Sequence, residues 1–239
     1  KIRLPRPKRI NEAGSGTTNK KDYDGLGLES SFKIGDAGDI RPYFIYSWSR
    51  RFQGGDNING VSSTFWDSNA ANNAGIYWAG LDTDWTLGSV ALYGSFAYSG
   101  GTIKGDGGFD DSDLKGYVVL LGADIPLGPA TIHTKGFYAS GDAAEVEPGS
   151  DINGYVGFSD SYYWSEIMGY GTLDDVAVSA GSPGDKLNNI WALNLGATIK
   201  PFDKLSIRGD LWYAEKPKDD PITDEKDLGV EGDIHINYE

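Results

Sequence analysis

The feature that most constrains this chain is a two-residue hydrophobic period that recurs from residue 23 to the end. In the stretch IRPYFIYSWSR, Phe44, Tyr46 and Trp48 stand at every second position. Successive side chains of a β-strand point to opposite faces, so this period predicts strands with one apolar and one polar face. The pattern predicts nine strands, near residues 23–34, 40–50, 74–87, 90–99, 114–125, 130–140, 189–199, 205–215 and 228–238. The segment 114–125 is apolar on both faces, which leaves its orientation open.

The connections between these strands alternate strictly in length. GDAGD (35–39) and PLGP (126–129) are among the short ones. The long ones, predicted to be external loops, are 51–73, 100–113, 141–188 and 216–227. Strict alternation places all tight turns at one end of an antiparallel meander, as in outer-membrane barrels. The strand lengths also suit the roughly 9–11 residues that a transmembrane strand needs. The sequence therefore predicts an all-β fold, an antiparallel up-and-down transmembrane β-barrel.

Aromatic residues on the apolar face gather near strand ends. Phe32, Trp85 and Tyr238 lie toward the short turns. A larger set lies beside the long loops: Tyr46, Trp48, Tyr77, Phe96, Tyr98, Tyr138, Trp191 and Tyr213. Amphipathic rings settle at the headgroup level of a bilayer, so this set is predicted to form a lipid-facing aromatic girdle. The polar face of each strand then points into the barrel.

The polar face supplies the predicted pore-lining residues. They are Arg41, Tyr43, Ser47, Arg51, Asp82, Asp84, His133, Lys135, Arg208, Asp210, Glu231, Asp233 and His235. Rings of charged side chains set the selectivity of an aqueous pore. The alternative is that they only solvate a lumen or form cross-strand pairs, such as Arg208 and Asp210 with Glu231 and Asp233. Their mixed signs indicate no preference for anions or cations.

The acidic stretch GDGGFDDSD offers the one candidate metal site. Its carboxylates, Asp106, Asp110, Asp111 and Asp113, are the oxygen ligands that Ca²⁺ takes. Their spacing differs from that of an EF-hand, and a solvated acidic loop is the alternative. No other cofactor is predicted. Acidic external loops are also suited to divalent cations shared with lipopolysaccharide.

Two further segments lie outside the strands. The 141–188 loop is too long for a simple connection, and its YVGFSDSYYWSEIMGYG core is aromatic enough to pack. It is predicted to fold into the barrel as a constriction or to cap it outside, with a disordered external loop as the alternative. Residues 1–22 are read as a basic, polar tail or external loop, which is also able to dip into the lumen.

Composition excludes several function classes. The net charge of −14 argues against nucleic-acid binding, which needs a basic face. The chain has no cysteine and two histidines, and it shows no nucleophilic triad, zinc-type spacing or phosphate-binding glycine loop. An enzyme is therefore not predicted. No apolar run approaches the roughly 20 residues of a membrane-spanning helix. The first ten residues lack the apolar region of a signal peptide.

With these residues in view, the chain resembles the Gram-negative outer-membrane β-barrels of the porin type. The stretches YYWSEIMGYGTLDD and NNIWALNLGATIKPFDKLSIRGDLWYAEKP are similar to alginate-export-like and large porins. The resemblance covers most of the chain from residue 23 and implies a closed barrel that conducts or exports a hydrophilic solute. Such barrels have an even strand number and both ends in the periplasm. Nine strands and a final NYE depart from this, so the chain is expected to be a fragment of a larger barrel, unless one strand is miscounted.

Three functions follow as hypotheses. The first is a channel in the bacterial outer membrane for small hydrophilic solutes or an anionic sugar polymer. The second is a barrel scaffold that encloses or docks a partner protein, such as an electron carrier or export component, without free conductance. The third is a soluble β-sandwich that binds carbohydrate. The expected partners are the lipid bilayer, lipopolysaccharide and a hydrophilic solute, with homo-oligomers or a partner protein in addition. The solute, the total strand number and the state of the lumen stay open.

Overall fold

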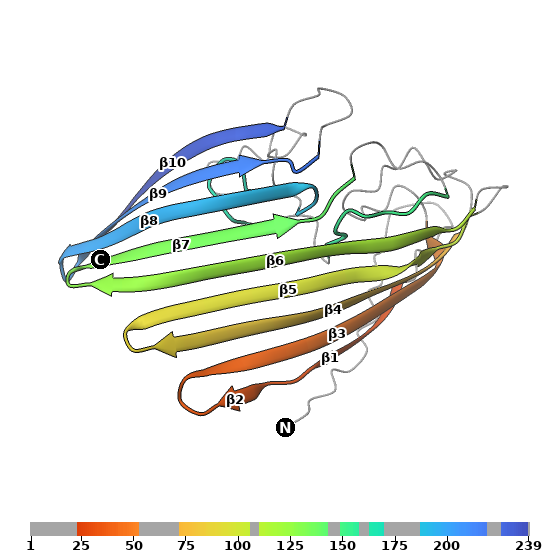
Figure 1. Ribbon diagram of the computed structural model, residues 1–239, viewed down its shortest axis with the longest axis horizontal. Helices are drawn as coiled ribbons and strands as arrows, with labels where there is room; N and C mark the ends of the chain where they lie inside the picture. Colours follow the sequence, from red (N-terminus) through yellow and green to blue (C-terminus); the bar gives the residue numbers. More distant parts are fainter. Residues whose placement is uncertain are drawn as a thin grey trace, which may run out of the picture.

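The computed structural model describes residues 23–52, 72–105, 110–142, 149–157, 163–169, 187–218 and 226–238. Its strands are β1 (Tyr23–Glu29), β2 (Phe32–Ile34), β3 (Gly38–Phe52), β4 (Asn72–Leu87), β5 (Val90–Ile103), β6 (Ser112–Leu127), β7 (Ala130–Ala139), β8 (Ile190–Phe202), β9 (Leu205–Glu215) and β10 (Asp227–Tyr238). They form one antiparallel 10-stranded sheet in the order β1-β3-β4-β5-β6-β7-β8-β9-β10, with β2 also paired to β3 (Figure 1).

The predicted up-and-down meander is confirmed, since each strand from β3 onward pairs with the next one in sequence. The predicted strand 23–34 is divided into β1 and β2, which pair with different parts of β3. Within the described residues the sheet is open, and β1 and β10 are its edge strands. The closed barrel that the resemblance implies is thus not what the described strands form.

Short and long connections alternate as predicted. The β4–β5 and β6–β7 hairpins turn through two residues each, and Gly88 and Gly128 there have φ of 64° and 60°. Two-residue hairpin turns need this left-handed backbone conformation, which glycine adopts without strain. The loops predicted at 51–73 and 100–113 are shorter in the structure. Strand pairing continues to Phe52 opposite Asn72 and to Ile103 opposite Ser112.

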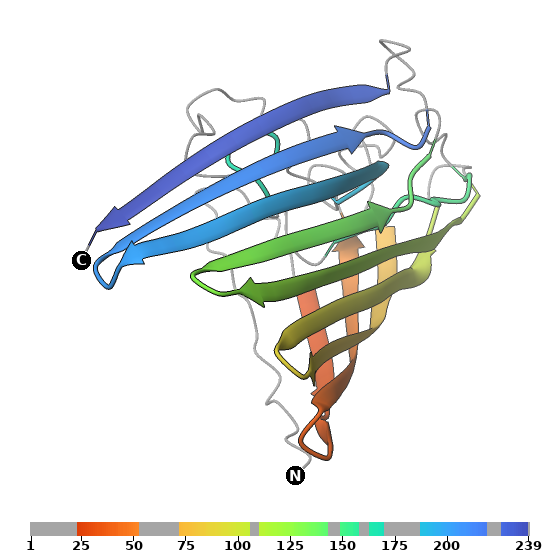
Figure 2. The same cartoon turned by 60° about the vertical axis from the view of Figure 1, so that its left-hand side comes forward.

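The register separates the side chains onto two faces. Residues directly opposite in an antiparallel pair share a face, so Tyr46 and Tyr77 lie together, as do Arg41 and Asp82. We call the face with Tyr46 the outer face and the face with Arg41 the inner face. The sheet is strongly curved, and in Figure 2 the orange strands near one edge run behind the green strand β6.

The outer face is apolar and exposed from one edge of the sheet to the other. Its exposed side chains include Leu26, Phe44, Leu81, Phe96, Leu121, Leu193, Leu195, Leu211, Val230, Ile234 and Ile236. Ile234 on β10 is 78% exposed. Among the described strand residues, charged side chains on this face stand only beside the long loops, at Asp24, Asp113, Lys115, Glu215 and Asp227. A soluble monomer rarely exposes so continuous an apolar surface.

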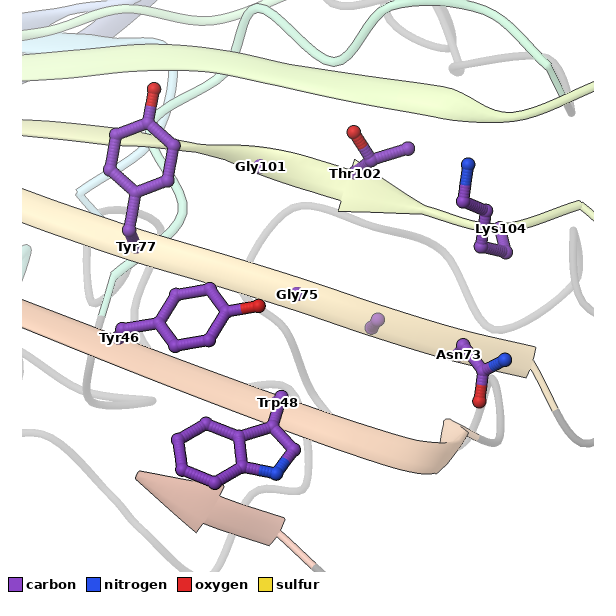
Figure 3. A pocket seen from close by; sticks show the side chains of 9 residues that line it. Tyr46, Trp48, Asn73, Gly75, Tyr77, Gly101, Thr102 and Lys104 are labelled. Carbon is purple, nitrogen blue, oxygen red and sulfur yellow. The ribbon is translucent and has the colours of Figure 1, made fainter. Parts of the chain in front are cut away.

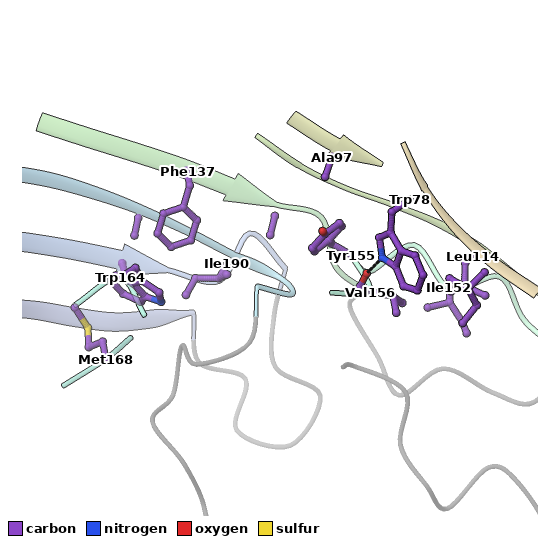
Figure 4. Close-up of a cluster of buried hydrophobic side chains, with 14 of the residues drawn as sticks. Trp78, Ala97, Leu114, Phe137, Ile152, Tyr155, Val156, Trp164, Met168 and Ile190 are labelled. Carbon is purple, nitrogen blue, oxygen red and sulfur yellow. Dashed lines mark hydrogen bonds between the residues drawn. The ribbon is translucent and has the colours of Figure 1, made fainter. Parts of the chain in front are cut away.

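The buried core lies on the inner face instead. Two segments from the long β7–β8 connection, residues 149–157 and 163–169, supply part of it (Figure 4). One group joins Ile152, Tyr155 and Val156 to Trp78 and Leu114, and another surrounds Trp164. The core residues are Ala74, Ile76, Trp78, Ala97, Ile103, Leu114, Phe137, Ala139, Ile152, Tyr155, Val156, Trp164, Met168, Ile190, Ala192, Trp212 and Ala214.

The structure also resolves the orientation of residues 114–125. Val118 and Leu120 face inward and pack against the core, while Leu121 faces outward and is 66% exposed. Both faces of this strand are apolar because one meets the inserted segments and the other belongs to the outer face.

Candidate functional site

The polar side chains of the inner face are the candidate site, because the register gathers them into rows across the sheet. One such row crosses from β4 to β10 through Asp84, Tyr93, Gly122, Lys135, Asn194, Trp212 and Glu231. Tyr93 lies over Gly122, where an added Cβ would collide with its ring. All predicted pore-lining positions other than Arg51 share this face. The side chain of Arg51 lies outside the described ones, and that the set lines a pore stays a prediction.

Asp210 on β9 is the centre of a buried hydrogen-bond cluster. Its Oδ1 lies 2.7 Å from His133 Nε2 and accepts a hydrogen bond of 3.0 Å from Asn194 Nδ2. Arg208 Nε donates to Oδ2 at 2.6 Å. Gly196 makes room for this arrangement, since a Cβ there would collide with His133 and Asp210. A buried carboxylate needs several donors, and this one has them.

A second charged cluster lies on β3 and β4 and is more exposed. Arg41 bridges two carboxylates, with Nη1 at 2.6 Å from Asp39 and Nη2 at 2.5 Å from Asp84. The Arg41 side chain is 34% exposed and that of Asp84 is 51% exposed. On the adjacent strand Ser95 donates to Asp82. Exposed pairs of this kind contribute little to stability.

The segment 163–169 is held on the inner face by Glu231 of β10. The Glu231 carboxylate accepts hydrogen bonds from the backbone N–H groups of Glu166, Ile167 and Met168, each at 2.8 Å. It also accepts one from Ser165 Oγ at 3.0 Å. Glu231 is 5% exposed, so these four donors replace its water.

Aromatic packing fixes the same segment to the sheet. The Trp164 ring lies edge-on between Phe137 and Trp212, with centroid separations of 5.2 and 5.1 Å. The Lys135 ammonium lies over the ring of Trp212, 4.8 Å from its centroid. Met168 is buried in the same group. Figure 4 shows Trp164 and Met168 beside Phe137 and Ile190.

The segment 149–157 packs on the part of the inner face that β4, β5 and β6 form. Ile152 forms a parallel bridge with Leu114 near the start of β6. Trp78 Nε1 donates to the Val156 carbonyl at 2.7 Å, and Val156 N donates to Ser99 Oγ at 3.0 Å. The described parts of the 141–188 loop therefore pack on the inner face of the sheet. That they constrict a barrel stays a prediction.

Two tryptophans that the sequence reasoning did not single out are central here. Trp78 and Trp212 stand at the polar-face positions of β4 and β9. Large aromatic side chains at those positions were the available signal that an inserted segment packs there. Glu166 of the 141–188 loop also belongs to the site, since its carboxylate accepts from the Tyr163 phenol and lies 3.5 Å from His235 Nε2. That hydrogen bond, together with burial, raises the pKa of Tyr163 to about 12.

The predicted aromatic girdle lies on the outer face, where neighbouring rings contact one another along a strand and across strands. Tyr46 stacks on Trp48, with the ring centroids 5.5 Å apart. Tyr77 contacts Tyr98, and Trp191 contacts Tyr213 at 5.3 Å. Tyr117, on β6, joins the row by stacking on Tyr138. The rings lie toward the strand ends beside the long loops, as the sequence predicts, except Phe96, which lies in the middle of its strand because β5 continues to Ile103. Their contact with lipid stays a prediction.

An open depression of about 660 Å³ interrupts this row on the outer face (Figure 3). Tyr46, Trp48 and Tyr77 border it, with Gly75 and Gly101 in its floor. Asn73, Thr102 and Lys104 form its polar end. It lies on the opposite face from the polar clusters and therefore belongs to a different surface.

The proposed calcium ligands do not converge in the described structure. Asp111 accepts from Lys104 and from the Gly105 N–H, and Asp113 accepts from Thr102. The Lys104 ammonium holds the pKa of Asp111 below its ordinary value. Among the described residues no three acidic or histidine side chains form a group suited to a metal ion. Asp106 lies outside the described residues, and Asp110 takes no part in such a group.

Comparison with known proteins adds no assignment. No protein-family model matches the chain, and no curated protein matches it. None of the described residues lies in a helix that is long and apolar enough to cross a membrane.

Proposed function

We propose that the chain forms part of an outer-membrane channel of the porin type for small hydrophilic solutes. The observation that carries this proposal is the division of the sheet into two faces. Its outer face is apolar and exposed, with aromatic rings along the long-loop end, whereas its inner face is polar. Lipid is the environment in which exposed Ile234 and Leu195 are stable, and water inside a pore suits Arg41 and Asp84.

The inner face further supports a narrowed channel. The segments 149–157 and 163–169 occupy part of the space that the curved sheet partly surrounds, and each is anchored by hydrogen bonds and apolar packing. A channel narrowed in this way would pass small solutes and exclude folded proteins.

The charges of the inner face favour cationic or neutral solutes over an anionic sugar polymer. Its described acidic residues are Glu29, Asp39, Asp82, Asp84, Asp124, Asp210, Glu231 and Asp233. Its described basic residues are Lys33, Arg41, Lys135 and Arg208. An excess of one sign in a narrow aqueous path raises the local concentration of the opposite charge.

The test is conductance of the full-length protein in a planar bilayer. We expect steady steps, with a reversal potential in a salt gradient that indicates cation preference. Two substitutions on β10 examine the faces. Ile234→Arg should impede insertion by about 2–4 kcal/mol, because it places a charge in lipid. Asn237→Arg, on the inner face of the same strand, should insert normally. Equal insertion of both variants would contradict the proposed orientation.

A barrel scaffold without free conductance is the second candidate. The apolar packing of Trp164 and Met168 against the inner face favours it, because a permanently packed segment blocks part of the lumen. Correctly inserted protein that gives no current would support this candidate and reject the channel. A water-soluble carbohydrate-binding sandwich is disfavoured by the exposed outer face.

A further inference from the structure

Glu231 is distinguished from the other acidic residues of the inner face by its hydrogen bonds to segment 163–169. Each of its carboxylate oxygens accepts two hydrogen bonds, Oε1 from the N–H groups of Glu166 and Ile167, and Oε2 from Met168 N and Ser165 Oγ. Three consecutive backbone N–H groups thus converge on one anion, which forms an anion-binding nest.

This nest requires a carboxylate at position 231. Buried backbone N–H groups must find acceptors, and a loop segment has no neighbouring strand to provide them. Hydrogen bonds to an ionised acceptor are about twice as strong as neutral ones. Glu231 is directly opposite Trp212 in the sheet, and the ring of Trp212 contacts Trp164. One strand pair therefore holds the segment by both its backbone and its largest side chain.

The segment has a packed side and a free side. Trp164, Met168 and the Glu166 carboxylate are buried against the sheet. Tyr163 and Ile167 are 64% and 52% exposed. The Tyr163 hydroxyl is fixed by its hydrogen bond to Glu166, so its ring does not project freely.

We infer that Glu231 is the positioning residue that holds segment 163–169 as a fixed wall, and that Tyr163 and Ile167 are its specificity-determining side chains. This inference rests on the proposed channel function. The wall sets the width of the path at this level, and the two exposed side chains are what a passing solute meets.

Amide hydrogen exchange of the full-length protein in detergent tests the positioning role of Glu231 and does not depend on channel conductance. In Glu231→Gln one carboxylate oxygen becomes an NH₂ donor, which leaves two donors of the nest without an acceptor. We expect the amides of residues 166–168 to exchange at least about tenfold faster. Ser165→Ala removes one donor and should have a smaller effect. Glu29→Gln makes the same chemical change on the inner face of the other edge strand and should leave these amides protected.

Conductance then tests the specificity role. Glu231→Gln, Tyr163→Ala and Ile167→Ala should each give larger current steps than wild type. Unchanged exchange in Glu231→Gln would overturn the positioning role. Unchanged steps in all three variants of a conducting wild type would overturn the specificity role alone. A silent wild type would reject the channel and the specificity role together, while the exchange result would still decide the role of Glu231.

Discussion

The two charged clusters of the inner face use the same residue types and stand on the same sheet, yet they differ in burial. Around Asp39, Arg41 and Asp84 the side chains are half exposed and pair with one another. Around Asp210 and Glu231 the carboxylates are buried and accept several hydrogen bonds each. The inserted segment 163–169 accounts for the difference, because it covers β9 and β10 and leaves the Arg41 cluster open.

The fold therefore uses charge in two ways on one surface. Where water remains, charged residues add to the field of the inner face and contribute little to stability. Where a segment excludes water, each carboxylate must be fully hydrogen-bonded, and its loss leaves donors unsatisfied. The covered side is thus expected to be structural, and the open side to act on solutes.

The largest effect should come from removing the side chain that covers the buried side. Trp164→Ala should lower the free energy of unfolding by about 3–5 kcal/mol, since it leaves a cavity between Phe137 and Trp212. Denaturant titration in detergent, followed by far-ultraviolet circular dichroism, measures this change. Phe44→Ala on the exposed outer face is the control and should cost less in the same detergent. Equal losses would mean that segment 163–169 contributes no packing of its own.

Replacing one carboxylate by its amide in each cluster measures how much burial changes the energetic role of the charge. Asp210→Asn removes the charge that Arg208 and His133 contact in a buried setting, and should cost about 2–3 kcal/mol. Asp84→Asn makes the same change in the exposed cluster, where Arg41 keeps Asp39, and should cost below about 1 kcal/mol. The same titration measures both. Similar losses for the two variants would break the distinction between the clusters.

The sequence predicts the strands and their faces because both depend on local spacing. The two-residue period assigns Phe44 and Ile234 to one face and Arg41 and Asp233 to the other, and the register agrees. It also predicts that the aromatic core of the long loop packs. The predicted ends of β3 and β5 come too early in the sequence. The last residues of these strands, Phe52 and Ile103, extend them only because they pair with Asn72 and Ser112.

The interior of the site could not be predicted in the same way. The donors to Glu231 are backbone N–H groups, which every residue carries, so no side-chain pattern marks them. The contact between Trp164 and Trp212 joins residues 48 positions apart through a loop path that spacing does not encode. The orientation of residues 114–125 depends on Ile152 and Val156 covering one side, which makes both faces apolar.

The smallest effect should appear at the free side of the inserted segment, and it depends on pH. The pKa of Tyr163 is raised from 10 to about 12 by its hydrogen bond to Glu166. The phenol therefore stabilises the fold fully below pH 10, and this contribution is lost as the pH rises toward 12. Because Tyr163 is exposed, the loss should stay below about 1 kcal/mol. Alkaline unfolding titrations of wild type and Tyr163→Phe isolate it, since all other tyrosines are common to both. In Glu166→Gln the acceptor is neutral, so the Tyr163 titration should move back toward pH 10. A titration that does not move would mean that burial, and not the carboxylate, holds the proton on this side chain.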